Sequence, residues 1–130
     1  MRRIMAIALP LLLVMPAVAQ EQNGDDGAQA EESEIGSGMA SYYGRELAGN
    51  RTASGEAFNP DDLTCAHRTL AFGTRIRVTN IANGKSVIVR VNDRGPWGRG
   101  RVIDISQAAA KQIGMHRTGT AKVRMTLVDD

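Results

Sequence analysis

The chain has 130 residues with 16 basic and 14 acidic side chains, a formal charge of +2, one cysteine and 4% aromatic residues. This length allows one folded domain at most. A single cysteine excludes an internal disulfide framework and a cysteine-rich zinc site. The few aromatic residues exclude an aromatic platform for nucleic acid and a large cofactor box. They are Tyr42, Tyr43, Phe58, Phe72 and Trp97.

The first segment has the pattern of a secretory signal peptide. It starts with Met1-Arg2-Arg3, continues with an apolar run over 4–18 that only prolines interrupt, and ends in small residues. We therefore expect residues 1–19 to be a signal peptide cleaved after Ala19. The alternative is a membrane anchor, but a span needs about 20 apolar residues. No cysteine lies directly after the apolar run to accept a lipid. We therefore expect a periplasmic or secreted protein that is neither a lipoprotein nor stably membrane-anchored.

Residues 20–36 form an acidic segment. They hold six acidic residues, no basic residue and Ile35 as the only large aliphatic side chain. Such a segment buries too little apolar surface to offset its ordering entropy, so we expect a disordered spacer. The segment 37–128 carries 14 basic and six acidic side chains, a charge of +8 against −6 for the spacer. We expect residues 37–130 to form a monomeric domain whose basic charge attracts an anionic polymer.

Short strand patterns run through this domain. Apolar and polar residues alternate in several runs, which is typical of half-buried strands. Asn83-Gly84 lies between two such runs and is the strongest short signal for a hairpin. The expected strands are 39–43, 75–79, 86–92, 102–103 and 121–128.

One short helix is expected near the end of the chain. Ser106 can cap a helix over 107–113, and Gly114 can end it. Several short strands, one brief helix and frequent glycines favour a mainly-β closed barrel over a sandwich.

Glu56 and His67 are the first residues that could carry chemistry. Glu56 precedes Phe58 by two positions, and a carboxyl beside an apolar ring can have a raised pKa and act as a general acid. His67 titrates near neutrality and can relay a proton. An ordinary surface glutamate and a structural histidine are the alternatives. His116 has the surroundings of a surface residue, and two histidines without a nearby carboxylate predict no metal site.

Two aspartates lie where strands are expected to end. Asp93 next to Arg94 is either a reactive carboxylate or part of a pair that braces a turn. Asp104 lies between isoleucines and is costly to bury unless it is hydrogen-bonded, for instance as a helix cap. Trp97 in a glycine-rich loop is a sugar platform or a plug of the barrel end. Cys65 has no adjacent basic residue and is expected in the core.

The sequence contains no phosphate-binding loop, dinucleotide-binding fingerprint, serine-hydrolase elbow or zinc-protease motif. Nucleotide, serine-hydrolase and zinc-protease functions, and a need for cofactors, therefore have no support. Carboxylates and one histidine on an exported basic domain instead fit acid–base cleavage of a glycosidic bond.

Several motifs occur in one order over residues 38–128, and together they closely resemble the rare lipoprotein A family of septal lytic transglycosylases. They include Gly38-Met-Ala-Ser-Tyr-Tyr-Gly44, Thr52-Ala-Ser-Gly-Glu56, Ala66-His-Arg-Thr-Leu70, Val91-Asn-Asp-Arg-Gly-Pro96 and Arg101-Val-Ile-Asp-Ile-Ser106. The resemblance implies a six-stranded double-psi β-barrel, as in barwin and expansins. It also implies cleavage of peptidoglycan glycan strands, in particular strands without stem peptides, with formation of 1,6-anhydro-muramic ends.

The resemblance also implies roles for individual residues. The family's catalytic positions fall on Glu56, His67 and Asp93, and Asp104 matches the acid of expansin-like barrels. We expect Asp93 or Glu56 to be the acid/base and His67 to give polar support. The expected substrate-binding residues are Tyr43, Ser54, Asn92, Arg94 and Trp97.

The chain departs from the family pattern in a few places. No lipid-accepting cysteine follows the signal peptide, and Asp130 ends the chain where many members continue into a peptidoglycan-binding repeat, so septal targeting is not expected. Ala71 and Asn59 replace a common proline and a common acid. Two other functions stay open: a glycan-binding module that cleaves nothing, like expansins, and a hydrolase that leaves reducing ends.

Overall fold

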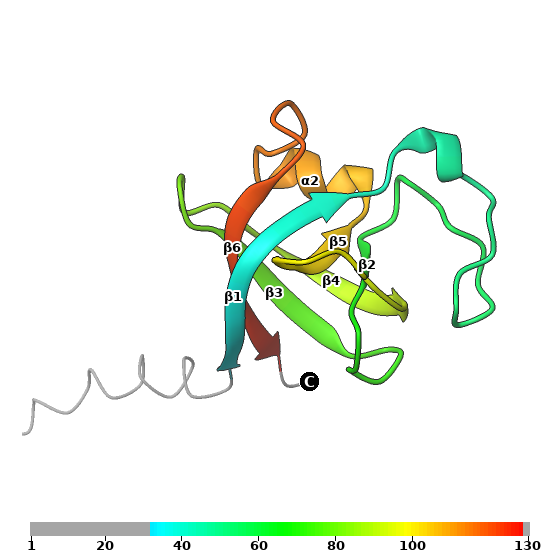
Figure 1. The fold of residues 1–130 in the computed structure, drawn as a ribbon, viewed down its shortest axis with the longest axis horizontal. Helices are drawn as coiled ribbons and strands as arrows, with labels where there is room; N and C mark the ends of the chain where they lie inside the picture. Colours follow the sequence, from blue (N-terminus) through cyan, green and yellow to red (C-terminus); the bar gives the residue numbers. More distant parts are fainter. Residues whose placement is uncertain (1–31, 129–130) are drawn as a thin grey trace, which may run out of the picture. The chain divides into compact units, whose positions relative to one another are not determined.

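A computed structural model describes residues 32–128 of the chain. In this part, six strands form one closed barrel with the neighbour order β1-β5-β2-β4-β3-β6 (Figure 1). The strands are β1 (Glu32–Tyr42), β2 (Thr64–Ala66), β3 (Arg75–Asn80), β4 (Ser86–Asp93), β5 (Arg101–Ile105) and β6 (Ala121–Val128). The helices are the 3-10 helix η4 (Arg45–Leu47) and the α-helix α2 (Gln107–Gln112). The mainly-β barrel predicted from the sequence is confirmed.

The alternating apolar residues line the inside of the barrel, as predicted. Each of them is at most 4% exposed, because successive side chains of a strand point to opposite faces of the sheet. They are Ile76, Val78, Val87, Val89, Val91, Val123 and Met125. Fully burying one such side chain contributes about 1.5–3 kcal/mol, so this layer is the main source of stability.

Helix α2 closes the core beside the β3–β4 hairpin. The Ser106 hydroxyl oxygen accepts a hydrogen bond from the backbone N–H of Ala109 at 3.3 Å, which confirms the predicted cap. Gly114 follows the helix with a φ of 73° and ends it. The carbonyl of Ile113 then accepts hydrogen bonds from the side-chain amides of Asn80 and Asn83, at 2.8 and 3.1 Å. These bonds fix the hairpin to the helix.

Strand β1 begins earlier than expected and corrects the boundary of the spacer. Residues 32–36 were placed in the spacer but form the start of β1. Closure of the barrel next to β6 supplies backbone partners that order this polar stretch. Residues 1–31, with the expected signal peptide and the rest of the spacer, lie outside the described residues.

Strand β2 was not predicted, yet it organises the sheet. It pairs in parallel with β4 and antiparallel with β5. Cys65 lies opposite Val91 whereas Ala66 lies opposite Asp93, so Asn92 is an additional residue in a bulge. A similar shift in the pairing of β1 with β5 skips Val102. Such bulges redirect side chains at the ends of strands.

Residues 43–63 leave the barrel between β1 and β2 and return to it (Figure 1). Phe58 anchors this excursion, since it is 4% exposed and its ring centroid lies 4.9 Å from that of Tyr43. Backbone hydrogen bonds at 2.7 and 2.8 Å join Phe58 to Asn50 and Gly49. Among the described residues, no helix is long and apolar enough to cross a membrane.

Candidate active site

A row of residues crosses four neighbouring strands of the barrel. Ser41 on β1 pairs with Asp104 on β5, Asp104 pairs with Ala66 on β2, and Ala66 pairs with Asp93 on β4. Ala66 is 0% exposed, whereas the three polar residues of the row, Ser41, Asp93 and Asp104, are half-buried and reach the surface. Adjacent strands lie about 4.8 Å apart, which puts the two aspartates about 10 Å apart across Ala66.

The Asp93 carboxylate is held by three donors. The hydroxyl of Tyr43 donates to Oδ2 at 2.6 Å, and the backbone N–H groups of Ala53 and Arg94 donate to Oδ1 at 2.9 and 2.8 Å. Asp93 therefore ties the end of β4 to β1 and to the loop around Ala53. Its position is fixed from three directions, as a reacting group requires.

The negative charges of Asp93 and Asp104 both act on the Tyr43 hydroxyl. Burial raises the pKa of the Tyr43 hydroxyl far above its usual range, and the hydrogen bond to Asp93 and the charges of Asp93 and Asp104 raise it further. The phenol therefore keeps its proton and remains a hydrogen-bond donor. The structure assigns Tyr43 a contact with Asp93.

Asp104 does not cap the helix, so that alternative is wrong. Its Oδ1 accepts a hydrogen bond from the Ser41 hydroxyl and lies 3.4 Å from Nη1 of Arg101. The same Nη1 donates to the Ser41 oxygen at 2.6 Å. Ser106 provides the cap instead. Ser41 and Arg101 had not been identified from the sequence, because their contact with Asp104 depends on strand pairing.

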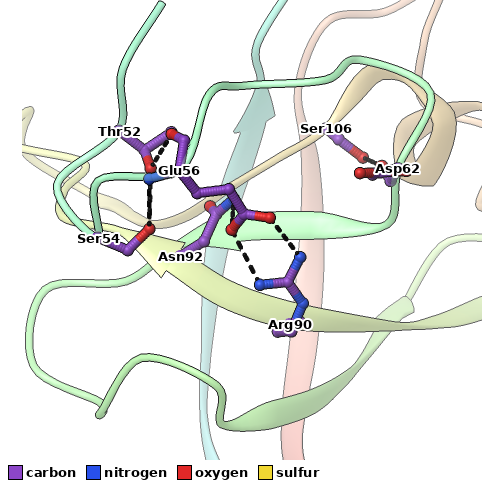
Figure 2. Close-up of polar contacts among 7 residues, drawn as sticks. All are labelled: Thr52, Ser54, Glu56, Asp62, Arg90, Asn92 and Ser106. Atoms are coloured by element: carbon purple, nitrogen blue, oxygen red, sulfur yellow. Dashed lines mark hydrogen bonds and ion pairs between the residues drawn. The ribbon is translucent and has the colours of Figure 1, made fainter.

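Glu56 is bound by a guanidinium group, as Figure 2 shows. Nη1 and Nη2 of Arg90 donate to its two carboxylate oxygens at 3.0 and 2.9 Å, and the Asn92 amide donates at 3.1 Å. These bonds lower the pKa of Glu56, with the Arg90 hydrogen bond as the largest cause. Of the two alternatives for Glu56, the raised pKa is therefore wrong, because Phe58 is buried and the carboxylate is bound by Arg90.

The loop that carries Glu56 is built by short polar contacts (Figure 2). The Ser54 hydroxyl lies 3.0 Å from that of Thr52 and accepts a hydrogen bond from the backbone N–H of Glu56 at 3.3 Å. The backbone N–H of Ser54 donates to the carbonyl of Asn92 at 3.2 Å. Asn92 is 3% exposed. Ser54 and Asn92, both expected to bind substrate, thus hold the loop against β4.

His67 is a neutral acceptor rather than a charged group. Burial lowers the pKa of His67, and the positive charges of Arg94 and Arg68 lower it further. Its Nδ1 accepts hydrogen bonds from the backbone N–H groups of Thr69 and Leu70, both at 3.2 Å. The ring proton therefore belongs on Nε2. The side chain lines a cavity of about 340 Å³ whose lining includes neither Asp93 nor Glu56.

Arg94 braces a loop. Its Nη1 donates to the carbonyls of His67 and Leu70 at 3.1 and 2.8 Å, and its guanidinium lies 4.1 Å from the centroid of the Phe72 ring. Of the two alternatives for Asp93, the ion pair with Arg94 is wrong, since Asp93 accepts only the backbone N–H of Arg94 and not its side chain.

Trp97 is 74% exposed, which excludes the role of a barrel plug. Its loop is held by Arg68, a residue that the sequence analysis did not identify. The Arg68 side chain donates to the carbonyls of Pro96, Gly98 and Arg101 at 2.6, 3.1 and 2.9 Å. The indole is thus exposed on a braced loop.

Cys65 is in the core and His116 is on the surface, as predicted from the sequence. Cys65 is 2% exposed, and burial raises the pKa of its thiol, so it is an unreactive core residue. His116 is exposed, and its carbonyl accepts the Tyr42 hydroxyl at 2.7 Å. Among residues 32–128, no group of three or more histidine, cysteine or acidic residues could hold a metal ion.

The model of the lytic transglycolase family matches residues 35–125. The chain belongs to this family. A relative in Synechocystis, named a probable endolytic peptidoglycan transglycosylase, is 47% identical over 98% of this chain and 40% of its own length. An endolytic peptidoglycan transglycosylase of Pseudomonas aeruginosa is 53% identical over 71% of this chain and 27% of its own. The chain thus spans 40% or less of the length of these two relatives.

The fold is also found in expansins. An expansin mutant of Clavibacter michiganensis, solved in complex with cellohexaose, matches with a TM-score of 0.57 and 21% identity. The match covers 76% of this chain and 51% of the expansin. The double-psi barrel that the lytic transglycosylase resemblance implies is confirmed.

Proposed function

We propose that this chain is a peptidoglycan lytic transglycosylase that uses Asp93 as its acid/base. The observation that supports this most is the strand pairing that places the half-buried Asp93 and Asp104 on either side of Ala66. Relatives that share about half of its residues are named endolytic peptidoglycan transglycosylases. Glu56 is not the proton donor in this proposal, because Arg90 holds it ionised.

The proposed reaction needs no water nucleophile. Asp93 protonates the glycosidic oxygen, and the bond from this oxygen to C1 of the muramic residue breaks. The C6 hydroxyl of the same sugar attacks C1, and its proton returns to the Asp93 carboxylate. Asp104, on the other side of Ala66, stabilises the positive charge that develops at C1. The products are a free hydroxyl end and a 1,6-anhydro-muramic end, and Asp93 regains its proton.

Product analysis tests this proposal. The full chain is incubated with peptidoglycan, and the released fragments are analysed by mass spectrometry. We expect 1,6-anhydro-muramic ends, and Asp93→Asn is expected to slow their release about 10²–10⁴-fold. Asp61→Asn is the matched control, because Asp61 is an exposed loop carboxylate paired with Arg45. Reducing ends would show a hydrolase, and unchanged release by Asp93→Asn would contradict the role of Asp93.

A glycan-binding module without cleavage is the second candidate. It is favoured by the 74% exposure of Trp97, since an exposed indole on a braced loop can stack on a sugar ring. This function predicts that the chain co-sediments with peptidoglycan and that Asp93→Asn and Glu56→Gln do not change the bound fraction. It also predicts that no fragment is released.

Export of the chain is part of the proposal. Its support is the basic, apolar and small-residue pattern of residues 1–19. Expression in a bacterial host should give a periplasmic or secreted protein whose amino-terminal sequence starts at Gln20. A protein that retains Met1 and stays in the cytoplasm would contradict export.

A further inference from the structure

The cavity of about 340 Å³ that His67 lines is not used by the proposed chemistry. Its polar side is formed by three residues that directly follow β2, namely His67, Arg68 and Thr69. Its apolar wall is formed by Ile35, Val102 and Met125. The volume is at the lower end of the range of about 300–1,000 Å³ that is typical of ligand pockets, which suits a group no larger than one sugar unit.

The cavity adjoins the row of aspartates through the backbone. His67 directly follows Ala66, the residue that pairs with both aspartates, and its backbone N–H donates to the carbonyl of Asp93 at 3.1 Å. Val102, in the apolar wall, precedes Asp104 by two positions on β5. Strand pairing therefore fixes both sides of the cavity relative to the aspartates. When one sugar of a glycan strand lies at Asp93, a neighbouring sugar can reach the cavity.

His67 offers the cavity a hydrogen-bond donor of fixed direction. Its Nδ1 accepts hydrogen bonds from the backbone N–H groups of Thr69 and Leu70, which hold the ring in place and leave its proton on Nε2. Burial, followed by the charges of Arg94 and Arg68, lowers the pKa of His67, so the ring is neutral at pH 7. No residue among 32–128 accepts a hydrogen bond from Nε2. This N–H can therefore donate to a ligand.

The groups that the cavity presents suit a neutral amide with a methyl group. The side chain of Arg68 donates from Nε and Nη2 to three backbone carbonyls, so its charge is directed to the loop between β4 and β5. The imidazole N–H of His67 can donate to an amide carbonyl, and the hydroxyl oxygen of Thr69 can accept from an amide N–H. The apolar wall can cover a methyl group. An acetamido group combines all three features.

We propose that this cavity binds the acetamido group of an N-acetylhexosamine in the glycan strand. Nε2 of His67 donates to the acetamido carbonyl, and the methyl group contacts the apolar wall that includes Val102. The inference rests on the proposed function, which supplies the glycan strand. Each sugar of peptidoglycan carries an acetamido group at C2, so the neighbour of the cleaved muramic residue has one. His67 is then a residue that determines specificity, and it takes no part in the proton transfers.

Two substitutions of His67 separate its role in binding from its role in the loop. The side-chain oxygen of His67→Asn takes about the place of Nδ1 and can accept the N–H groups of Thr69 and Leu70, but nothing replaces Nε2. In His67→Gln the amide nitrogen reaches about the place of Nε2, but the acceptor at the place of Nδ1 is lost. His116→Asn is the matched control, since His116 is exposed and does not line the cavity.

The ligands are the β-1,4-linked tetramers of N-acetylglucosamine and of glucose, which are both neutral and differ only at C2. Calorimetry with the full chain measures the affinity for each. We expect the wild type and His116→Asn to prefer the N-acetylated tetramer about ten-fold. The preference should fall to about two-fold in His67→Asn and be largely retained in His67→Gln, while the affinity for the glucose tetramer stays the same in all four proteins.

Several results would overturn the proposal. They are equal affinities of the wild type for the two tetramers, no binding of the N-acetylated tetramer, and a preference that falls in His67→Gln as much as in His67→Asn or more. The last result would show that only the loop contact of Nδ1 matters.

The tetramers contain no muramic residue, so their binding does not depend on the proposed cleavage. The expected preference, found in a chain that releases no anhydro ends from peptidoglycan, would support the acetamido site and contradict only the proposed function. Release of anhydro ends by a chain without this preference would overturn the acetamido site and leave the proposed function in place.

Discussion

Glu56 is held as a carboxylate by two hydrogen bonds from Arg90 and one from Asn92, and these bonds lower its pKa below the ordinary 4.5. A lowered folded-state pKa adds stability above the ordinary pKa, and this contribution is lost as the pH falls through the folded value. We predict that Glu56→Gln lowers the free energy of unfolding at pH 7 by at most about 1 kcal/mol, because the pair is partly exposed.

Urea denaturation of both proteins at pH 7 and at successively lower pH measures this difference. The gap between wild type and Glu56→Gln should close as the pH falls below 4.5, where the carboxylate is progressively protonated. Glu46→Gln, on the exposed helix η4, serves as the control for loss of a surface charge. A gap of the same size at every pH would contradict the stabilising role of the ion pair.

The Tyr43 hydroxyl is a neutral donor to Asp93, and the Tyr43 ring packs against that of Phe58 at an interplanar angle of 38°. We predict that Tyr43→Phe lowers kcat about ten-fold, because the hydroxyl stabilises the carboxylate that Asp93 becomes once it has protonated the glycosidic oxygen, and a hydrogen bond to a charged group contributes about 1.5–3 kcal/mol. The retained ring contact should keep the thermal midpoint near that of wild type. Tyr42→Phe is the matched control, since Tyr42 donates to the carbonyl of His116. Equal losses of kcat in both variants would show that the hydroxyl of Tyr43 has no specific role.

At the scale of elements, the loop between β4 and β5 depends on Arg68. Two carbonyls of this loop, at Pro96 and Gly98, and the carbonyl of Arg101 at the start of β5 accept hydrogen bonds from one guanidinium. We predict that Arg68→Ala loosens the loop and leaves the barrel folded. Trp97 is the only tryptophan, so acrylamide quenching and anisotropy of its fluorescence report on the loop directly. Anisotropy should fall in Arg68→Ala and stay unchanged in Arg99→Ala, an exposed arginine of the same loop. Wild-type anisotropy in Arg68→Ala would exclude the bracing role.

The sequence predicts the strands in which apolar and polar residues alternate and the helix that has a capping residue. It misses β2 and the start of β1, which have neither signal. Alternation identified β3, β4 and β6, and the Ser106 cap and Gly114 identified α2. Strand β2 has only three residues, all buried, so no alternation can be seen in it. The start of β1 was missed because Glu32–Gly36 is polar and is ordered by its neighbours in the barrel rather than by its own composition.

At the scale of the whole molecule, the site depends on contacts that no local pattern encodes. The motif resemblance identified Glu56, Asp93 and Asp104 as candidate residues. It did not show which side chains bind their carboxylates. The partner of Glu56 lies 34 positions away at Arg90, and that of Asp104 lies 63 positions away at Ser41. Closure of the barrel creates both contacts. The sequence could therefore identify Glu56 but could not show that its pKa is lowered.

The distribution of charge over the chain predicts how the proposed binding to peptidoglycan depends on salt. Residues 37–128 carry a net charge of +8, and residues 20–36 carry −6. Attraction between the basic barrel and an anionic wall acts over the Debye length, which falls from about 10 Å at 0.1 M salt to about 3 Å at 1 M. We therefore predict that the fraction co-sedimenting with peptidoglycan falls as salt is raised over this range. Binding to chitin, an uncharged glycan, should change little. A co-sedimenting fraction that is the same at both salt concentrations would show that contacts other than charge hold the barrel to peptidoglycan.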